Sequence, residues 1–180
     1  MRQITRWWMC AVLLTMALLM IRQAQAAPPS MEQRKAEAVW LRSEECHSVQ
    51  IVVTLTQNET VASPYYPDGW VRTAWVSVLE TNPCTNTQLL NAAGQLETQT
   101  GLAIDRKLES AVFAGTVLTW DGVTQTEGVV NVNTSWTGTG PLNRQVWRTV
   151  SRGATAQLDL SGFGLTLSQS TADAQLSITK

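Results

Sequence analysis

The fold of this chain is decided by a stretch that reads Leu108-Glu-Ser-Ala-Val-Phe-Ala-Gly-Thr-Val-Leu-Thr-Trp120, then Asp121-Gly122, then Val129-Val-Asn-Val-Asn-Thr-Ser-Trp136. It is closed by Thr137-Gly-Thr-Gly-Pro-Leu142. Both runs are rich in Val, Thr and aromatic residues, which pack well on a pleated sheet, and Asp-Gly supplies the backbone conformations of a tight turn. The stretch therefore predicts a β-hairpin.

The two runs differ in how their side chains alternate. The first run has apolar residues on both faces, which predicts a central strand covered on both sides. These residues are Val112, Ala114, Leu118 and Trp120 on one face, and Ala111, Phe113 and Val117 on the other. The second run alternates between apolar and polar residues, which predicts one buried and one solvent-facing side. Its apolar side holds Val130, Val132 and Trp136, and its polar side holds Asn131, Asn133 and Ser135.

Runs with similar alternation predict further strands along the chain. They cover residues 36–42, 49–56, 70–80, 89–96, 145–150, 154–167 and 172–179. The phase of the run 154–167 shifts at Gly162, where we expect a bulge or tight bend. Residues 31–42 also resemble a helix, with a capping box at Ser30 and Gln33, and we choose a strand over 36–42. The total of eight to ten strands predicts an all-β antiparallel sandwich, with a β-barrel as the alternative.

The amino terminus predicts a secretory signal peptide. Arg2 and Arg6 precede an apolar run over residues 7–21, and small residues follow at Ala24 and Ala26. The run is too short to span a bilayer about 30 Å thick, so we expect cleavage after Ala26 rather than an anchor. The predicted organisation is a signal peptide over 1–26, an extended lead-in over 27–35, and a single β-domain over 36–180.

Charge argues against nucleic acid and membrane partners. Cleavage would remove Arg2, Arg6 and Arg22, which lowers the 13 basic residues to ten against 14 acids, a formal net charge of −4. The longest basic runs are the pairs Arg34-Lys35 and Arg106-Lys107. A mildly acidic chain without a basic cluster in its sequence lacks the electrostatic signature of either partner.

Two cysteines, Cys46 and Cys84, remain after the predicted cleavage. An even count in an oxidising compartment favours one disulfide between them, and two free buried thiols are the alternative. The bond would close a loop of about forty residues, which the chain-entropy relation values at about 3 to 4 kcal/mol.

Four segments resemble a group of bacterial secreted β-proteins. These are Cys46, Cys84-Thr-Asn-Thr-Gln-Leu-Leu90, Ile104-Asp-Arg-Lys-Leu-Glu-Ser-Ala111 and Trp136-Thr-Gly-Thr-Gly-Pro-Leu142. The resemblance covers residues 36–142. It implies a hairpin that ends at the first cysteine, which favours the strand at 36–42, and it carries no functional residues to this chain.

No catalytic or metal-binding motif stands out. His47 is the single histidine, its sequence neighbour is Cys46, and no Gly-x-Ser-x-Gly elbow occurs. Two cysteines and one histidine are too few for a structural zinc site, and no run of acids matches a calcium loop. Asp68 and Asp121 each precede a glycine, where we expect them to cap their own turns. We therefore expect no metal and no cofactor.

Aromatic residues are the remaining candidates for a binding site. Six tryptophans follow the predicted cleavage site, and most should be buried in a small β-domain. In the predicted strand 145–150, Trp147 would point away from Val146 and Val150, and we expect Trp70 to lie near Tyr65 and Tyr66 at the edge of a loop. These four aromatic residues are the candidate ligand-binding residues.

The sequence therefore predicts a secreted, non-enzymatic β-sandwich with a binding or structural role, whose partner would be a glycan or another surface protein. The first alternative is a carbohydrate-binding module that uses exposed tryptophan and tyrosine rings. The second is a hydrolase that uses a pair of carboxylates, which would lie close together in a cleft.

Overall fold

The computed structural model describes residues 31–144 and 148–180. The expected signal peptide and the cleavage after Ala26 lie outside these residues. The described part of the chain contains nine strands and no helix, so the all-β prediction is confirmed. The strands are β1 (Gln33–Glu44), β2 (His47–Glu59), β3 (Trp70–Asn82), β4 (Thr87–Thr98), β5 (Leu102–Ile104), β6 (Ser110–Asp121), β7 (Thr126–Arg144), β8 (Thr149–Gly162) and β9 (Leu165–Thr179).

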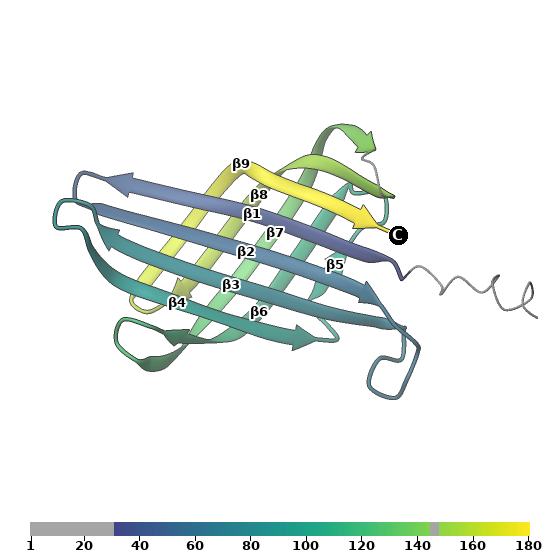
Figure 1. Cartoon of the computed structure of the whole chain (residues 1–180), viewed down its shortest axis with the longest axis horizontal. Coiled ribbons are helices and arrows are strands. Elements are labelled where there is room, and N and C mark those ends of the chain that lie inside the picture. The colour runs from purple at the N-terminus through teal and green to yellow at the C-terminus, as the bar shows by residue number, and fades with distance from the viewer. Residues whose placement is uncertain (1–30, 145–147) are drawn as a thin grey trace, which may run out of the picture. The chain divides into compact units, whose positions relative to one another are not determined.

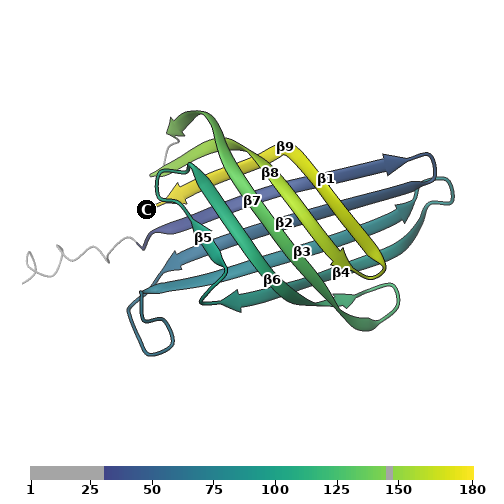
Figure 2. The ribbon, with the colours of Figure 1, turned by 180° about the vertical axis from the view of Figure 1, so that it is seen from behind.

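The strands form one antiparallel sheet that folds over into two layers. The strand order is β4-β3-β2-β1-β9-β8-β7-β6-β5. Strands β1 to β4 form the first layer, and β6 to β9 cross obliquely behind it as the second layer (Figure 1). Figure 2 shows the second layer from its own side, with β5 beside β6. The predicted antiparallel sandwich is therefore confirmed, and it is built from a continuous sheet.

Two features let the sheet pass from one layer to the other. The pairing of β8 with β9 shifts its register between Ala154 and Ala156, and only the last part of β9 pairs with β1. A register shift bends a strand and increases its twist, which is how a strand turns the corner between two packed layers. At the other edge of the first layer, β4 pairs with β6 through Ala92, Ala93 and Gly94.

Gly94 allows the close approach of β4 and β6. A Cβ atom at Gly94 would lie 2.0 Å from the backbone oxygen of Leu118, so no larger residue fits without moving a strand. The additional pairing of β4 with β6 is therefore made at a point that favours glycine.

The core lies between the two layers. Alternate residues of each strand point inward, and the largest of these side chains that are fully buried include Trp40, Ile51, Leu55, Phe113, Trp136 and Leu158. The rings of Trp40 and Trp136 meet edge to face, with their centroids 6.2 Å apart. Burial of these apolar side chains is the main stabilising contribution, since each removes a large apolar surface from water.

The structure corrects several sequence predictions. Gly162 marks neither a bulge nor a bend within one strand, because β8 ends there and β9 begins at Leu165 after a tight turn. Positive φ angles at Gly162 and Gly164 produce that reversal. Residues 137–142, which we expected to end the second strand of the hairpin, belong to β7, whose register shifts between Thr139 and Asn143.

Three further corrections concern the strand limits and exposure. The ambiguous segment 31–42 is a strand from Gln33 onward, so β1 begins within the expected lead-in. The short strand β5 was missed because three residues carry too little alternation to detect. The predicted cover on both faces of β6 is wrong, since Val112, Leu118 and Trp120 are exposed.

Candidate functional site

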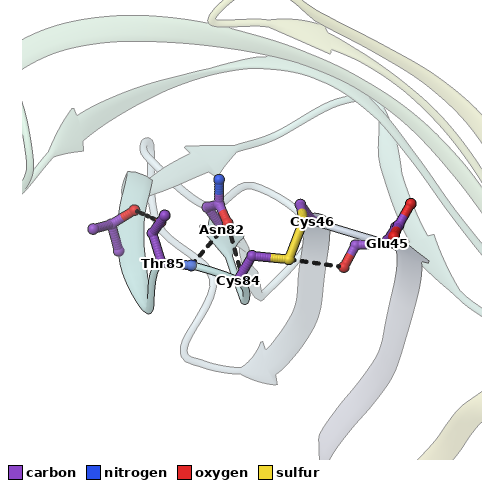
Figure 3. The surroundings of a disulfide bond; sticks show 6 residues. Glu45, Cys46, Asn82, Cys84 and Thr85 are labelled. Atoms are coloured by element: carbon purple, nitrogen blue, oxygen red, sulfur yellow. Dashed lines mark hydrogen bonds between the residues drawn. A yellow bond between two sulfur atoms is a disulfide. The ribbon is translucent and has the colours of Figure 1, made fainter.

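The disulfide predicted between Cys46 and Cys84 is present, with a Cα–Cα distance of 5.2 Å. It links the turn after β1 to the turn after β3, at one tip of the first layer (Figure 3). Asn82 shapes the second turn, because its Oδ1 atom accepts hydrogen bonds from the backbone N–H groups of Cys84 and Thr85. The bond therefore joins the two hairpins of the first layer.

His47 lies near this tip and pairs with an acid on the neighbouring strand. Its Nε2 atom is 2.6 Å from Oε1 of Glu80, across β2 and β3. The described residues contain no group of three or more His, Cys, Asp or Glu side chains placed to hold a metal ion. None of the described segments is a helix long and apolar enough to cross a membrane.

Three carboxyl groups of the described chain have a lowered pKa, and each has a structural partner. Hydrogen bonds from the Thr124 hydroxyl and from the Asn91 backbone lower the pKa of Asp121 to about 2. Asp121 also accepts hydrogen bonds from the backbone of its own turn, so its predicted capping role is confirmed. These bonds connect the β6–β7 turn to β4.

Asp68 and Glu32 are held by arginine. A hydrogen bond from Arg72 lowers the pKa of Asp68, whose Oδ1 also caps its turn at the Trp70 backbone, as predicted. Burial raises the pKa of Glu32, but hydrogen bonds and charge from Arg34 and Lys180 outweigh burial, so the pKa is lowered. A catalytic acid needs a raised pKa, and these three groups show the opposite shift.

The three expected aromatic residues that the structure describes have different surroundings. The Arg34 guanidinium lies 4.5 Å from the centroid of the Trp70 ring and covers one of its faces. Tyr65 is 82% exposed in the loop before β3, and the Tyr66 hydroxyl donates a hydrogen bond to Glu97. That bond raises the pKa of Tyr66. Trp147 lies outside the described residues.

Among the described residues, the exposed tryptophans are Trp120 and Trp75, which the sequence analysis did not select. Trp120 is 48% exposed on β6 and Trp75 is 38% exposed on β3. A signal for Trp120 was present in the sequence. The polar side of β7 was recognised, and in an antiparallel hairpin the residues opposite one another share a face. Once Thr116 is paired with Asn131 and Leu118 with Val129, Trp120 must lie on the same solvent-facing side.

Polar side chains cover most of the outward face of the second layer. Three rows of neighbours run across its four strands, as the strand pairings place them. The rows are Thr116–Asn131–Ser161–Thr166, Ala114–Asn133–Asp159–Ser168 and Val112–Ser135–Gln157–Ser170. We call the ten polar residues of these rows the outer polar face. Asp159 is its single charged residue.

The outer polar face is hollowed by three neighbouring depressions. The largest has a volume of about 470 Å³ and includes Asn131, Asn133 and Asp159 in its lining. A second of about 360 Å³ shares Asn133 with it, and a third of about 300 Å³ shares Asp159 and Ser168. The shared residues make the three depressions one continuous surface that crosses the strands.

Most residues of the outer polar face are exposed to solvent. Thr116 donates a hydrogen bond to Asn131, with a length of 2.7 Å. The side chains of Asn133, Gln157, Asp159 and Ser168 are all exposed. Amide, hydroxyl and carboxylate groups supply both donors and acceptors, so the face can bind a ligand rich in hydroxyl groups.

Comparisons with known protein families, with curated proteins and with solved structures find no match to this chain.

Proposed function

We propose that this chain is an exported, non-enzymatic binding protein whose outer polar face binds a neutral carbohydrate. The single observation that carries this proposal is the row of amide, hydroxyl and carboxylate side chains that crosses the second layer through Asn133 and Asp159. Binding sites typically combine a depression with a few convergent polar groups that orient the ligand.

The chemistry of the face fits a sugar better than a charged ligand. An anionic ligand would require cations, and no Lys or Arg lines the three depressions. A sugar presents hydroxyl groups that both donate and accept hydrogen bonds, which amide groups such as Asn131 and Asn133 can match. The Asp159 carboxylate can accept hydrogen bonds from two adjacent hydroxyl groups, and such charge-assisted bonds are about twice as strong as neutral ones.

Trp120 supplies an apolar surface at one end of the face. It lies four residues from Thr116 along β6, which corresponds to about 13 Å in an extended strand. Leu118 and Val129 lie between, paired across β6 and β7 and exposed. A chain of several sugars would reach from Asp159 to Trp120 and would place the flat face of one ring on the indole.

Asp159 is the single acid that lines these depressions, and this favours binding over hydrolysis. A carboxylate-based glycoside hydrolase uses two acids about 5 to 9 Å apart, one of them with a raised pKa. No second acid lines the depressions around Asp159. Export is supported by the apolar run at residues 7–21 and by the disulfide, since disulfides persist in oxidising compartments.

Affinity electrophoresis through gels that contain neutral polysaccharides tests the proposal, with calorimetry on soluble oligosaccharides as the quantitative measurement. We expect at least one neutral glucan, mannan, xylan or galactan to retard the protein. Asp159→Ala and Asn133→Ala should each weaken binding about tenfold, because each removes hydrogen bonds worth about 1.5 kcal/mol. Trp120→Ala should also weaken binding to the longer oligosaccharides.

Matched substitutions elsewhere control for general effects on the surface. Asp173→Ala removes an exposed acid of β9 outside the depressions, and Trp75→Ala removes the exposed tryptophan of the first layer. Both variants should bind like the unchanged protein. Absence of retardation by every polysaccharide, or equal binding by the Asp159 and Asp173 variants, would contradict the proposal. Release of reducing sugar would instead support the hydrolase alternative.

A further inference from the structure

Another pocket lies at the end of the sandwich where the last residues of β9 pair with the first residues of β8. Its volume is about 220 Å³, and its lining comes from segments far apart in the sequence. The four basic residues of its lining are Arg106, Lys107, Arg148 and Lys180. No acidic residue lines it. We call it the basic pocket.

The apolar part of the basic pocket is continuous with the core between the layers. Val150 and Ile178 are paired across β8 and β9, and Ile178 is buried. Leu108 lies in the turn before β6 and is also buried, whereas Leu142 on β7 is 51% exposed. The pocket therefore has an apolar floor inside the sandwich and an apolar lip at its opening.

The turn over residues 105–109 places Arg106 and Lys107 at this opening. Asp105 accepts hydrogen bonds from the backbone N–H groups of Lys107 and Glu109, which closes the turn. Leu108 takes a positive φ angle of 57° there, and its side chain is buried. The turn directs Leu108 inward, whereas Arg106 and Lys107, which precede it, are exposed at the surface.

Positive charge in the basic pocket exceeds the negative charge near it. Among the described residues, Glu32 is the acid within ion-pair distance of these cations, at 3.4 Å from Lys180 and 4.0 Å from Arg106, and it is already bonded to Arg34 at 2.7 Å. Asp105 and Glu109 lie in the same turn as Arg106 and Lys107, and the Asp105 carboxylate is bonded to the backbone there. Among the described residues, no acid lies within ion-pair distance of Lys107 or Arg148. Cations grouped beside a low-dielectric floor attract an anion more strongly than the same cations spread over an open surface.

We propose that the basic pocket binds a short alkyl carboxylate, with its tail on Leu108, Val150 and Ile178 and its carboxylate among Lys107, Arg148 and Lys180. The combination of a cationic rim and an apolar floor complements such an anionic amphiphile in both charge and polarity. The ligand is short because 220 Å³ is below the size of ordinary small-molecule sites, about 300 Å³ and above. The site is separate from the outer polar face and does not depend on its function.

A nuclear magnetic resonance titration of the purified protein with sodium octanoate tests this inference. We expect saturable shifts of the backbone amide signals of Leu108, Leu142, Val150 and Ile178. Octanol has the tail without the charge, and acetate has the charge without the tail, so each should bind at least about tenfold more weakly than octanoate. Octanol binding as tightly as octanoate would show that the cations play no part and would overturn the proposal.

Charge substitutions at exposed positions distinguish binding in the basic pocket from a general effect of net charge. Lys107→Glu combined with Arg148→Glu should weaken octanoate binding at least about tenfold, and the corresponding double substitution to Gln should weaken it less. Arg42→Glu makes the same change of charge as Lys107→Glu but lies at the opposite end of β1 from the residue that pairs with Ile178, and it should leave the affinity within about twofold. Equal effects of Lys107→Glu and Arg42→Glu, or signal shifts confined to other regions, would overturn the inference.

Discussion

The two layers of the sandwich share one interior but have different outward faces. The first layer, β1 to β4, carries a mixture of charged, hydroxyl and apolar residues on its outside, such as the ion pair of Lys35 and Glu37 and the ring of Trp75. The second layer carries rows of neutral amide and hydroxyl groups around Asp159, hollowed by depressions. Inward residues of both layers are constrained by burial, whereas outward residues are not. Burial therefore does not account for the polar rows of the second face, whereas the carbohydrate ligand that we propose would account for them.

The largest expected effect is a loss of stability when a tryptophan of the shared interior is replaced, which a replacement on the outward face should not cause. Trp136 is buried, packs against Trp40 and donates a hydrogen bond from Nε1 to the Glu37 backbone. Trp136→Ala should lower the free energy of unfolding by about 3 to 5 kcal/mol, because it leaves a large cavity. Trp120→Ala, on the outer face, should cost about 1 kcal/mol or less. Denaturant unfolding measures both, and equal losses would mean that Trp120 belongs to the core.

Removal of the disulfide should affect the two layers unequally. Cys46 and Cys84 are 38 residues apart, and a bond across that separation contributes about 4 kcal/mol in the chain-entropy relation. The double substitution Cys46→Ser with Cys84→Ser should lower stability by about this amount. Hydrogen exchange should quicken at the tips of β1 to β4 first, while polysaccharide binding by the intact fold persists. Loss of binding in a variant that is still folded would show that polysaccharide binding by the second layer depends on the disulfide of the first layer.

A smaller effect is expected where the two layers meet at β4 and β6. Gly94→Ala would place a methyl group against the Leu118 backbone, 2.0 Å away before relaxation, and should cost about 1 to 3 kcal/mol. Gly122→Ala is the control, because the nearest atom to its Cβ is 3.7 Å away. Thermal unfolding distinguishes the two variants. A Gly94 variant as stable as the control would mean that β4 and β6 separate at little cost.

The smallest expected effect is the loss of stability at acidic pH. The pKa of Asp121 is about 2 in the folded chain and 3.8 as its ordinary value, so folding favours the ionised carboxylate. Its contribution to stability is therefore complete above about pH 4 and is lost as the pH falls through about 2. Asp121→Asn should flatten this part of the stability curve, which denaturant unfolding at a series of pH values measures. An unchanged curve would show that the junction between β4 and the β6–β7 turn does not depend on this charge.

Much of the fold could be predicted because strands leave a local signal. The alternation of Val130, Val132 and Trp136 gives the buried side of β7, and Asp121-Gly122 gives its turn. The cysteine pair was also predictable, since two cysteines allow one intramolecular bond. The reversal at Gly162 was not, because a phase shift looks the same whether a strand bends or ends.

The candidate sites were much less predictable. Asn133 on β7 and Asp159 on β8 are ordinary polar residues in the sequence, and only the pairing of these strands makes them neighbours. The basic pocket joins residues from the turn before β6, from β7 and β8, and from the end of the chain. A search for basic runs finds only pairs, because the cluster is assembled by folding.

The sequence by itself determined that the chain forms antiparallel strands with apolar inner faces and one disulfide. Alternation is a property of neighbouring residues along the chain, and the number of cysteines can be counted without knowing the fold. Tertiary structure alone decided which polar residues align in rows on the second layer, on which face Trp120 is exposed, and which cations surround the basic pocket. These features depend on strand register and on contacts between distant segments, and a shift of one residue in register would turn every side chain to the opposite face.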